Sequence, residues 1–345
     1  MCLFPKHGLA LAPMRAITQP PFWKILNHYG QPDAYFTEFV RVHENFLIDE
    51  TWIENVLDSA QGCPVWVQLM GNDITAFEKN IRILEHYPIA GIDFNAGCPI
   101  PKIFKKQAGG GLLRDLPLLR ELLLAIKSIS RKPLSVKFRI GFNSADHFDE
   151  ILAILSEVHP DLVTLHARTV SDLYKALPRY EYITKAVHQL PCPVLANGSI
   201  DSLNDIDSIF LSTQCHGAML GRAIIRNPWL FKQWRNILNN EPIIYPTFEA
   251  VLQYLRDLFT AFTLDQKAET TALGCLKRFT NYIGLAVDNE GIFLTHIRTA
   301  QTLKAFWNVC QQFLDNDNPY VGNAFPNLFA QPNKETSSGE TTQSA

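Results

Sequence analysis

One short apolar run sets the pattern of this chain: Leu134-Ser135-Val136-Lys137-Phe138-Arg139-Ile140. Similar runs recur between residues 9 and 222, and each is followed by polar or glycine-rich residues and then by a helix-like stretch. Near-continuous Val, Ile, Leu and Phe character is typical of a parallel strand that is covered on both faces. The eight runs are residues 9–14, 34–39, 65–70, 91–95, 134–140, 162–168, 194–198 and 217–222.

Eight strand-helix units predict an α/β fold, a (β/α)8 TIM barrel, over residues 1–242. A doubly wound open sheet is the alternative architecture. We favour the barrel because polar residues of uncommon type follow nearly every strand, and the strand ends of a barrel converge on one mouth where active sites lie. Apolar residues recur at helical spacing in the segments 115–129, 146–158 and 202–211. We expect the second of these helices to begin with an Asp as its N-cap.

The pattern changes after Pro246. Amphipathic stretches of helix length follow at 248–262, 268–286 and 293–313, without strand signals. They predict a smaller, C-terminal all-helical domain over residues 243–330. Residues 331–345 are rich in Ser, Thr, Gln and Glu and predict a disordered tail.

Composition limits the classes of protein that remain. The chain is 47% hydrophobic and 19% charged, and no apolar run approaches the roughly 20 residues that span a bilayer, so a membrane protein is not expected. The N-terminus lacks the apolar core of an export signal, and the seven scattered cysteines form no C-x-x-C, so we expect neither disulfides nor a metal site. We expect a monomer in a reducing cytoplasm.

The net charge of −3 argues against a nucleic-acid partner, because such proteins usually carry a basic excess. Any RNA surface must therefore be local. The candidates are Lys102, Lys105 and Lys106 in one loop and Lys277-Arg278 in a later helix; solvated surface cations are the alternative for each.

The last two strands of the predicted barrel end on a phosphate-binding pattern. Strand seven ends Ala196-Asn197-Gly198-Ser199, and strand eight ends Leu220-Gly221-Arg222. Barrels commonly bind a phosphate between these two loops, where glycines permit close backbone approach and an Arg supplies charge. The alternative is that the glycines merely turn the chain.

Lys137 and Arg139 project to the same side of their strand, toward the barrel interior if their apolar neighbours face the helices. Two inward cations need an anionic partner, because burying an unpaired ammonium is costly. The electron-rich edge of a reduced flavin is such a partner, and His166 and Gln68 are placed to complete its hydrogen bonds. Taken alone, His166 is more often a core residue.

Cys98 lies in Asn95-Ala96-Gly97-Cys98-Pro99, on the loop after strand four. A thiol with the usual pKa of about 8.5 is mostly protonated at neutral pH, so it can donate a proton as well as attack. Without context Cys98 is structural as often as catalytic. The context is residues 102–111, basic and then glycine-rich, which suit a mobile loop beside a polyanionic substrate.

Taken together, nine short sequence motifs make the chain resemble the tRNA-dihydrouridine synthases over nearly its whole length. The forms TEFVRV and GGGLL are most similar to the bacterial C-type branch, which modifies uridine 16 in the tRNA D-loop. The motifs are LAPM (11–14), TEFVRV (37–42), VQLMG (67–71), DFNAGCP (93–99), GGGLL (109–113), VKFRIG (136–141), LHART (165–169), ANGSI (196–200) and MLGR (219–222).

The resemblance implies a bound flavin mononucleotide (FMN), reduced by NADPH, that passes hydride to uracil while Cys98 donates a proton from the opposite face. It assigns the flavin ring to Pro13, Met14, Gln68, Lys137 and His166, and the phosphate to Asn197, Gly198, Ser199, Gly221 and Arg222. It places Asn95, Arg139, Tyr174 and Arg41 on the substrate side. It also gives the helical domain to tRNA, with Lys277 and Arg278 as phosphate contacts.

Two other functions are compatible with parts of this pattern. An FMN barrel oxidoreductase that acts on a free pyrimidine or another small molecule shares the phosphate and lysine features, but does not require helices after Pro246. A catalytically silent RNA-binding barrel is the second. The joint presence of Cys98, Lys137 and His166 argues against it.

Overall fold

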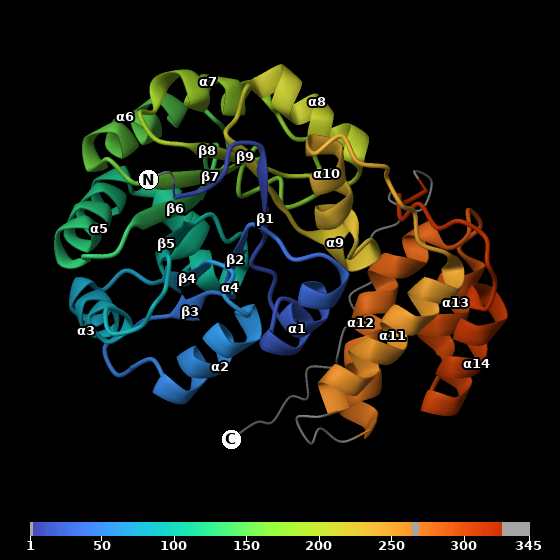
Figure 1. The fold of residues 1–345 in the computed structure, drawn as a ribbon. Coiled ribbons are helices and arrows are strands. Elements are labelled where there is room, and N and C mark those ends of the chain that lie inside the picture. Colours follow the sequence, from blue (N-terminus) through green and yellow to red (C-terminus); the bar gives the residue numbers. More distant parts are fainter. Residues whose placement is uncertain (1–2, 264–268, 326–345) are drawn as a thin grey trace, which may run out of the picture.

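The computed structural model describes residues 3–263 and 269–325, and its centre is a closed parallel barrel (Figure 1). β2 and β3 both pair with β4: Tyr35 of β2 pairs with Val65, and Val40 of β3 pairs with Leu69. The two short strands therefore occupy a single strand position of the barrel. β1 pairs with β2 on one side and β9 on the other, which closes the sheet. The predicted TIM barrel is therefore confirmed, and the open sheet is excluded. The strands are β1 (Gly8–Leu11), β2 (Ala34–Phe36), β3 (Val40–Arg41), β4 (Val65–Met70), β5 (Gly91–Ala96), β6 (Leu134–Arg139), β7 (Leu162–His166), β8 (Val194–Asn197) and β9 (Gly217–Leu220).

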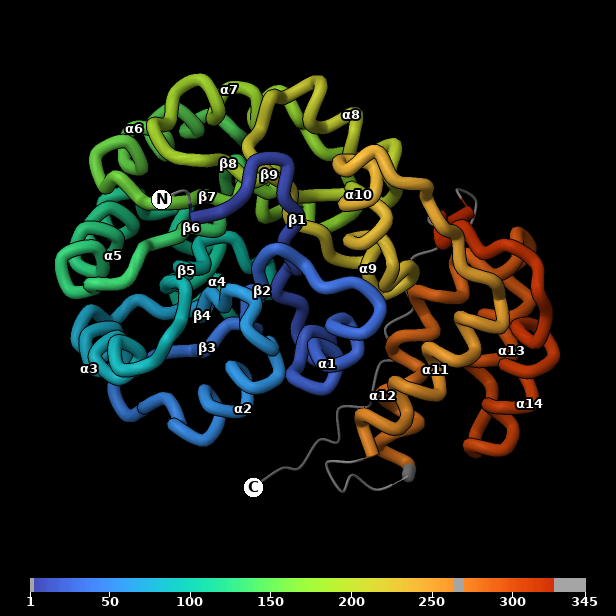
Figure 2. The backbone as a smooth tube through the Cα atoms, viewed as in Figure 1, coloured from blue at the N-terminus to red at the C-terminus, as the bar shows by residue number. Residues whose placement is uncertain are grey.

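Helices surround the barrel, as the tube in Figure 2 shows. Their caps explain where two of them begin: Asp115 accepts a hydrogen bond from the Leu118 amide at 3.2 Å, and Ser202 accepts one from the Asp205 amide at 3.1 Å. The Asp cap expected near 146 was wrong, because Asp146 bonds to Ser144 instead. The helices are α1 (Pro20–Tyr29), α2 (Glu50–Ala60), α3 (Ile74–Leu84), α4 (Pro101–Phe104), η1 (Gly109–Arg114), α5 (Leu116–Ile129), α6 (Phe148–Val158), α7 (Glu181–Gln189), α8 (Leu203–Thr213), α9 (Arg222–Arg226) and α10 (Leu230–Leu238).

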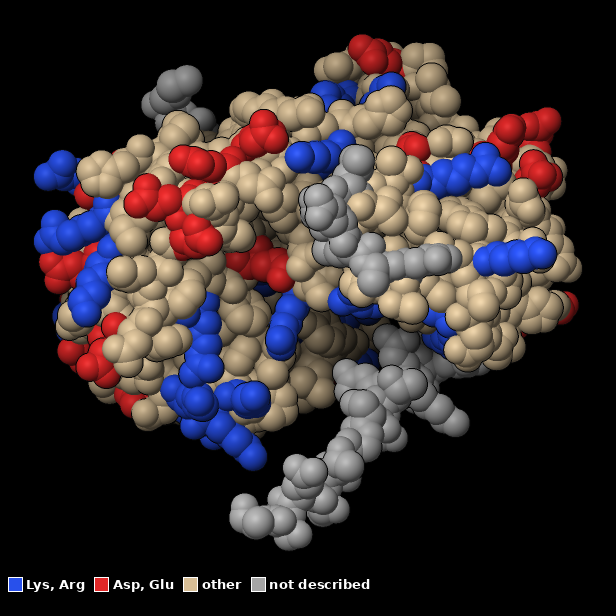
Figure 3. All heavy atoms as spheres, turned by 90° about the horizontal axis from the view of Figure 1, so that it is seen from below, with Lys and Arg blue, Asp and Glu red and all other residues tan. Residues whose placement is uncertain are grey.

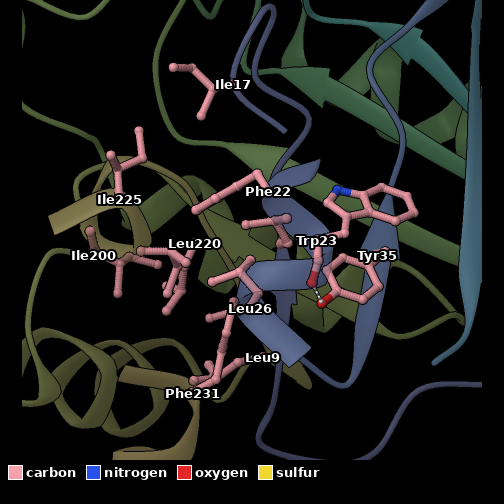
Figure 4. Packing of buried hydrophobic residues seen from close by; sticks show 14 of the residues in the cluster. Leu9, Ile17, Phe22, Trp23, Leu26, Tyr35, Ile200, Leu220, Ile225 and Phe231 are labelled. Atoms are coloured by element: carbon pink, nitrogen blue, oxygen red, sulfur yellow. Dashed lines mark hydrogen bonds between the residues drawn. The ribbon is translucent and has the colours of Figure 1, made fainter. Parts of the chain in front are cut away.

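The alternation of side chains along each strand divides the apolar residues into two cores. The outer core lies between strands and helices; Figure 4 shows Phe22 and Leu26 of α1 packed near Leu9 and Leu220 of the barrel. The inner core fills the bottom of the barrel and includes Phe36 and large side chains such as Trp66. Because apolar side chains fill the bottom of the barrel interior, the polar side chains of the interior lie above them, toward the carboxyl ends of the strands.

The C-terminal helices are α11 (Phe248–Thr263), α12 (Glu269–Ile283), the 3-10 helix η2 (Gly284–Ala286), α13 (Ile292–Thr299) and α14 (Leu303–Leu314). They stand beside the barrel, where α11 packs on α1 and α12 packs on α9 (Figure 1). The single helix expected over 293–313 was wrong: the chain is extended at Ala300, and the Thr302 hydroxyl caps a new helix by accepting from the Ala305 amide at 3.1 Å.

The division into domains at 242 and 243 stays a prediction, and the expected tail at 331–345 lies outside the described residues. Among the helices in the described part of the chain, none combines the length and apolar character needed to cross a bilayer.

Candidate active site

A cavity of about 520 Å³ opens at the carboxyl ends of the strands. One wall comes from β6, from the carboxyl ends of β5, β7, β8 and β9 with the loops that follow them, and from the loop after β1, and the other comes from α12, η2 and α13. The sequence-predicted residues that line it are Pro13, Met14, Asn95, Cys98, Lys137, Arg139, His166, Tyr174, Asn197, Gly198, Ser199, Gly221 and Arg222.

The charge of this cavity is strongly one-sided. Its described lining contains a single carboxylate, Asp201, which already pairs with Arg226 at 2.5 Å. In the view of Figure 3, Lys and Arg side chains border a hollow in the surface. A chain with a net charge of −3 thus concentrates positive charge where its loops converge, which favours an anionic ligand. The cations in the lining are Arg15, Lys137, Arg139, Arg168, Arg222 and Arg298.

His166 lies at the end of β7 among four of these cations and is 6% exposed. Burial, and then the charges of Arg139, Lys137, Arg168 and Arg222, hold the pKa of His166 well below its usual value. The imidazole is therefore neutral at physiological pH, and its role is hydrogen bonding.

The loop after β8 brings a glycine and a hydroxyl next to this histidine. Gly198 has a φ of +118°, and a Cβ at this position would lie 3.1 Å from Nε2 of His166, so both the backbone and the space require glycine. Arg168 donates from Nη2 to the Ser199 hydroxyl at 2.7 Å, while its Nη1 lies 3.1 Å from Nε2 of His166. The ends of β7 and β8 are thus joined by a buried guanidinium.

Lys137 projects into the barrel interior, as predicted from the sequence. Its Nζ donates to Oδ1 of Asn197 at 3.3 Å, and the amide of Asn197 donates in turn to the Met219 carbonyl at 2.7 Å. Burial and the neighbouring charge of Arg139 lower the pKa of Lys137, whereas Asp93 and Cys98 oppose this shift.

The Cys98 loop is held closely. Oδ1 of Asn95 accepts from the amides of Gly97 and Cys98 at 3.1 and 2.9 Å. The Gly110 amide donates to the Cys98 carbonyl at 3.0 Å, and a Cβ on Gly109, whose φ is +56°, would lie 2.9 Å from Cβ of Cys98. The segment 102–111, expected to be a mobile loop, instead contains most of the short helix α4 and the first three residues of the 3-10 helix η1, and Gly109 and Gly110 are buried next to Cys98.

Burial raises the pKa of the Cys98 thiol, which is 8% exposed, although Arg139 and Lys137 oppose the rise. The thiol therefore stays protonated at neutral pH. A protonated thiol facing a cationic cavity is suited to donating a proton rather than to nucleophilic attack.

Arg139 connects two of the loops at the mouth. Its Nε donates to the Gly97 carbonyl at 3.0 Å, and Nη1 donates to the carbonyls of Thr169 and Leu173 at 2.8 and 2.9 Å. The guanidinium also lies 5.3 Å from the ring centre of Tyr174, which is 57% exposed. Tyr174 thus presents an aromatic face at the open side of the cavity.

Comparison with known proteins identifies the family. The family model "Dihydrouridine synthase (Dus)" matches residues 10–282. The chain belongs to the dihydrouridine synthase family. A "Probable tRNA-dihydrouridine synthase" of Helicobacter pylori is 34% identical over 264 residues, which is 73% of this chain and 79% of that protein. A "tRNA-dihydrouridine(16) synthase" of Neisseria meningitidis is 26% identical over 304 residues, 86% of this chain and 91% of the relative.

The barrel also resembles solved structures outside the dihydrouridine synthase family. The histamine dehydrogenase of Rhizobium sp. 4-9 aligns with a TM-score of 0.51 at 13% identity, over 68% of this chain and 46% of that one. A 2-naphthoyl-CoA reductase aligns with a TM-score of 0.52 at 11% identity, over 69% of this chain and 51% of the other. At such identities the likeness concerns the fold alone.

Four residues that the family resemblance placed in the site lie outside the cavity lining. Gln68 is fully buried below the cavity, where it bonds to Asn95. Arg41 is exposed on β3. On α12, Lys277 donates to the Arg298 carbonyl at 3.1 Å and Arg278 is exposed.

Sequence reasoning left other lining residues out of the site. Arg15 directly follows Met14, and Arg168 ends the apolar run at 162–168, so both carried a signal. The lining residues of the C-terminal helices carried none, because the face that α12 turns to the barrel depends on its packing against α9. They are Asn281, Tyr282, Leu285, Leu294 and Arg298.

Proposed function

We propose that this protein reduces a uridine of tRNA to dihydrouridine, with FMN as its bound cofactor and NADPH as the reductant. The observation that carries the proposal is the cavity in which six cations face one paired carboxylate, with the protonated thiol of Cys98 in the same lining. Membership of the dihydrouridine synthase family supports the reaction.

The residues present fit a flavin mononucleotide. The cavity volume of about 520 Å³ lies within the range of cofactor sites. Its cations need an anionic partner, and a phosphate and an electron-rich ring meet that need. At Gly221 an added Cβ would lie only 3.2 Å from Sδ of Met14, so glycine keeps this corner open.

We assign the cofactor contacts as follows. Lys137, His166, Pro13 and Met14 hold the ring, and Gln68 supports that part of the site from below through Asn95. Neutral His166 serves as a hydrogen-bonding group and not as an acid. The phosphate is assigned to Asn197, Gly198, Ser199, Gly221 and Arg222, with Arg168 fixing the Ser199 hydroxyl.

The chemistry divides between the cofactor and one side chain. When bound, reduced FMN supplies the hydride that the uracil C6 position accepts. Cys98 donates its proton to C5, and because burial raises its pKa, the thiol is in the required protonated form at neutral pH. This proton completes the reduction of the C5=C6 bond, and the thiolate that results regains a proton from solvent.

The tRNA is assigned to the open side of the cavity. Asn95, Arg139 and Tyr174 lie nearest the target base, with the exposed ring of Tyr174 available for stacking. Lys277, Arg278 and Arg41 contact phosphates farther out. We further propose uridine 16 as the target, which the name of the Neisseria meningitidis relative supports, and a cytoplasmic monomer as the working form.

The test combines cofactor analysis with nucleotide mapping. The purified protein should be yellow and should release FMN and not FAD on denaturation, as chromatography of the released flavin would show. Dihydrouridine at position 16 should disappear from tRNA of cells that lack the gene and return with the purified protein, NADPH and tRNA. Reduction of free uracil with no activity on tRNA would favour the small-molecule oxidoreductase instead.

A further inference from the structure

A fully buried carboxylate below the cavity is connected to the Cys98 loop by hydrogen bonds. Oδ2 of Asp93 on β5 accepts from Nε2 of Gln68 at 2.6 Å. Oε1 of Gln68 accepts from Nδ2 of Asn95 at 2.8 Å. Oδ1 of Asn95 then accepts from the amides of Gly97 and Cys98. The chain of bonds thus runs from the barrel interior to the proton donor.

The two ends of this chain have fixed polarity, while its two middle members do not. An ionised carboxylate only accepts hydrogen bonds, and a backbone N–H only donates them, but a side-chain amide can present either its oxygen or its nitrogen. Because Asp93 accepts, Gln68 must turn its Nε2 inward and its Oε1 toward Asn95. Asn95 must then offer its nitrogen to Gln68 and its oxygen to the loop.

Asp93 is costly to keep at this depth. Burial raises its pKa, and the hydrogen bond from Gln68 and the charge of Lys137 only oppose that rise. No ion pair within 4.0 Å joins Asp93 to a cation in the described residues. A buried charge without a close partner adds little to the stability of the fold. The contribution of Asp93 that the geometry supports is therefore the orientation of Gln68.

We propose that Asp93 is a positioning residue for the proton donor: it fixes the orientation of Gln68 and Asn95 and thereby holds the Cys98 loop at the cavity. The role of Cys98 in this inference rests on the proposed function. The loop is held from its other side by Arg139, which donates to the Gly97 carbonyl. The peptide groups around Gly97 are therefore restrained through both their N–H and their C=O.

Three variants separate this role from general damage to the barrel. Asp93→Leu removes the fixed acceptor. Asp93→Asn removes the charge but keeps an oxygen that can accept from Gln68. Thr164→Val is the matched control, because Thr164 is a fully buried interior residue, paired in register with Lys137, whose hydroxyl has no hydrogen-bond partner among the described residues.

The first readout is the rate at which iodoacetamide alkylates Cys98 in the flavin-loaded protein, followed by mass spectrometry of the Cys98 peptide. Loosening the loop exposes a thiol that is 8% exposed in the folded protein. Asp93→Leu should therefore react about fivefold faster, the factor that one average hydrogen bond represents. Asp93→Asn and Thr164→Val should react like the unaltered protein.

The second readout is the pair of half-reactions. In Asp93→Leu, flavin bleaching by NADPH should keep its rate, while reoxidation by tRNA should slow by at least the same fivefold factor. Should the leucine variant fail to fold, Asp93→Ala also lacks an acceptor and should behave in the same way.

Two results would overturn the inference. Equal alkylation rates in Asp93→Leu and Thr164→Val mean that Asp93 does not hold the loop. An Asp93→Asn variant as reactive as Asp93→Leu means that the charge acts on Lys137 and that the hydrogen-bond chain is irrelevant. If the unaltered protein forms no dihydrouridine, the proposed function fails separately, because the alkylation rates do not depend on tRNA.

Discussion

The barrel and the C-terminal helices carry cations of different kinds in and around the cavity. The barrel cations, Lys137, Arg139, Arg168 and Arg222, come from strand ends, and two of them are almost fully buried: Arg139 is 2% and Arg168 is 3% exposed. The helix cations, Lys277, Arg278 and Arg298, lie on α12 and α13, and the last two are exposed.

This difference in burial separates two modes of anion binding. Charges in a low-dielectric pocket interact strongly over short distances and are little screened by salt. Exposed charges are screened, and they bind a polyanion mainly by releasing its counterions. The barrel cations are therefore suited to one small anionic ligand in a fixed pose, and the helix cations are suited to an extended one.

The largest expected effect concerns the proton donor beside the barrel cations. Cys98→Ala removes the acid but leaves the pocket around Lys137 and His166 intact. Reoxidation of the flavin by tRNA should fall by roughly 10²–10⁴-fold, the usual contribution of general acid catalysis. Bleaching by NADPH should keep its rate, and stopped-flow absorbance measures both steps.

Cys215→Ala is the control for this experiment, because Cys215 is also buried but lies next to the start of β9, at the opposite end of the barrel strands. It should leave both half-reactions unchanged. An equal loss of both steps in Cys98→Ala would indicate that Cys98 supports the fold, and no loss in either would assign the proton to another group.

The second prediction tests whether a barrel cation holds the cofactor. Arg222→Ala should weaken FMN binding by roughly 10–100-fold, because a hydrogen bond to a charged group is worth about 1.5–3 kcal/mol. Titration of flavin fluorescence gives the dissociation constant. Arg120→Ala, which removes an exposed arginine paired with Glu157 on the outer helices, should leave it unchanged; a similar loss in both variants would contradict the assignment.

The strand-end residues were predictable because barrel closure converts sequence position into spatial position. In register, Asn95 pairs with Lys137 and Arg139 pairs with His166, so residues at the ends of neighbouring strands meet at one mouth. The same regularity predicted the fold, including the closed sheet. Gln68 is a partial exception, since it ends one layer lower and supports Asn95 instead of lining the cavity.

The residues that could not be predicted depend on packing or on competing local bonds. Asn281 and Tyr282 line the cavity only because α12 packs on α9, which its amphipathic pattern does not specify. The predicted helix over 293–313 is broken because Thr302 caps a new start. Asp93 is the first residue of the DFNAGCP motif, but its role becomes visible only in the structure, where Gln68 of the neighbouring strand donates a hydrogen bond to it.

The third prediction uses pH to test the influence of the barrel cations on His166. Their charges and burial hold the pKa of the folded imidazole well below the ordinary value of 6.5. Below pH 6.5 the unfolded chain therefore binds a proton that the folded chain does not, so stability falls as the pH falls. At pH 5.5 the loss relative to pH 7.5 should be about 1.4 kcal/mol.

Urea unfolding of the flavin-free protein measures this loss. The control is His166→Gln, which has no titrating group at this position, so other pH-dependent groups cancel when the two proteins are compared. The His166 protein should lose about 1.4 kcal/mol more than the variant over this pH range. Parallel losses would show that His166 is protonated in the folded state and that the barrel cations do not govern it.

The smallest expected effect concerns the helix cations. Lys277 and Arg278 lie within about one helical turn of Asn281 and Tyr282 on α12, so they border the cavity without lining it. If each contacts one phosphate, replacing both with Ala should lower the slope of log affinity for tRNA against log salt by about 0.7–0.9 per contact. Over a fourfold change in salt concentration, this slope corresponds to a roughly threefold change in tRNA affinity for each contact.

The matched control is Arg256→Ala with Lys304→Ala, which removes the same charge from exposed positions on α11 and α14 outside the cavity lining. Filter-binding at several salt concentrations should show the reduced slope only for the α12 pair. Equal slopes for the two double variants would mean that Lys277 and Arg278 belong to a solvated helix face and that the tRNA follows another path across the protein.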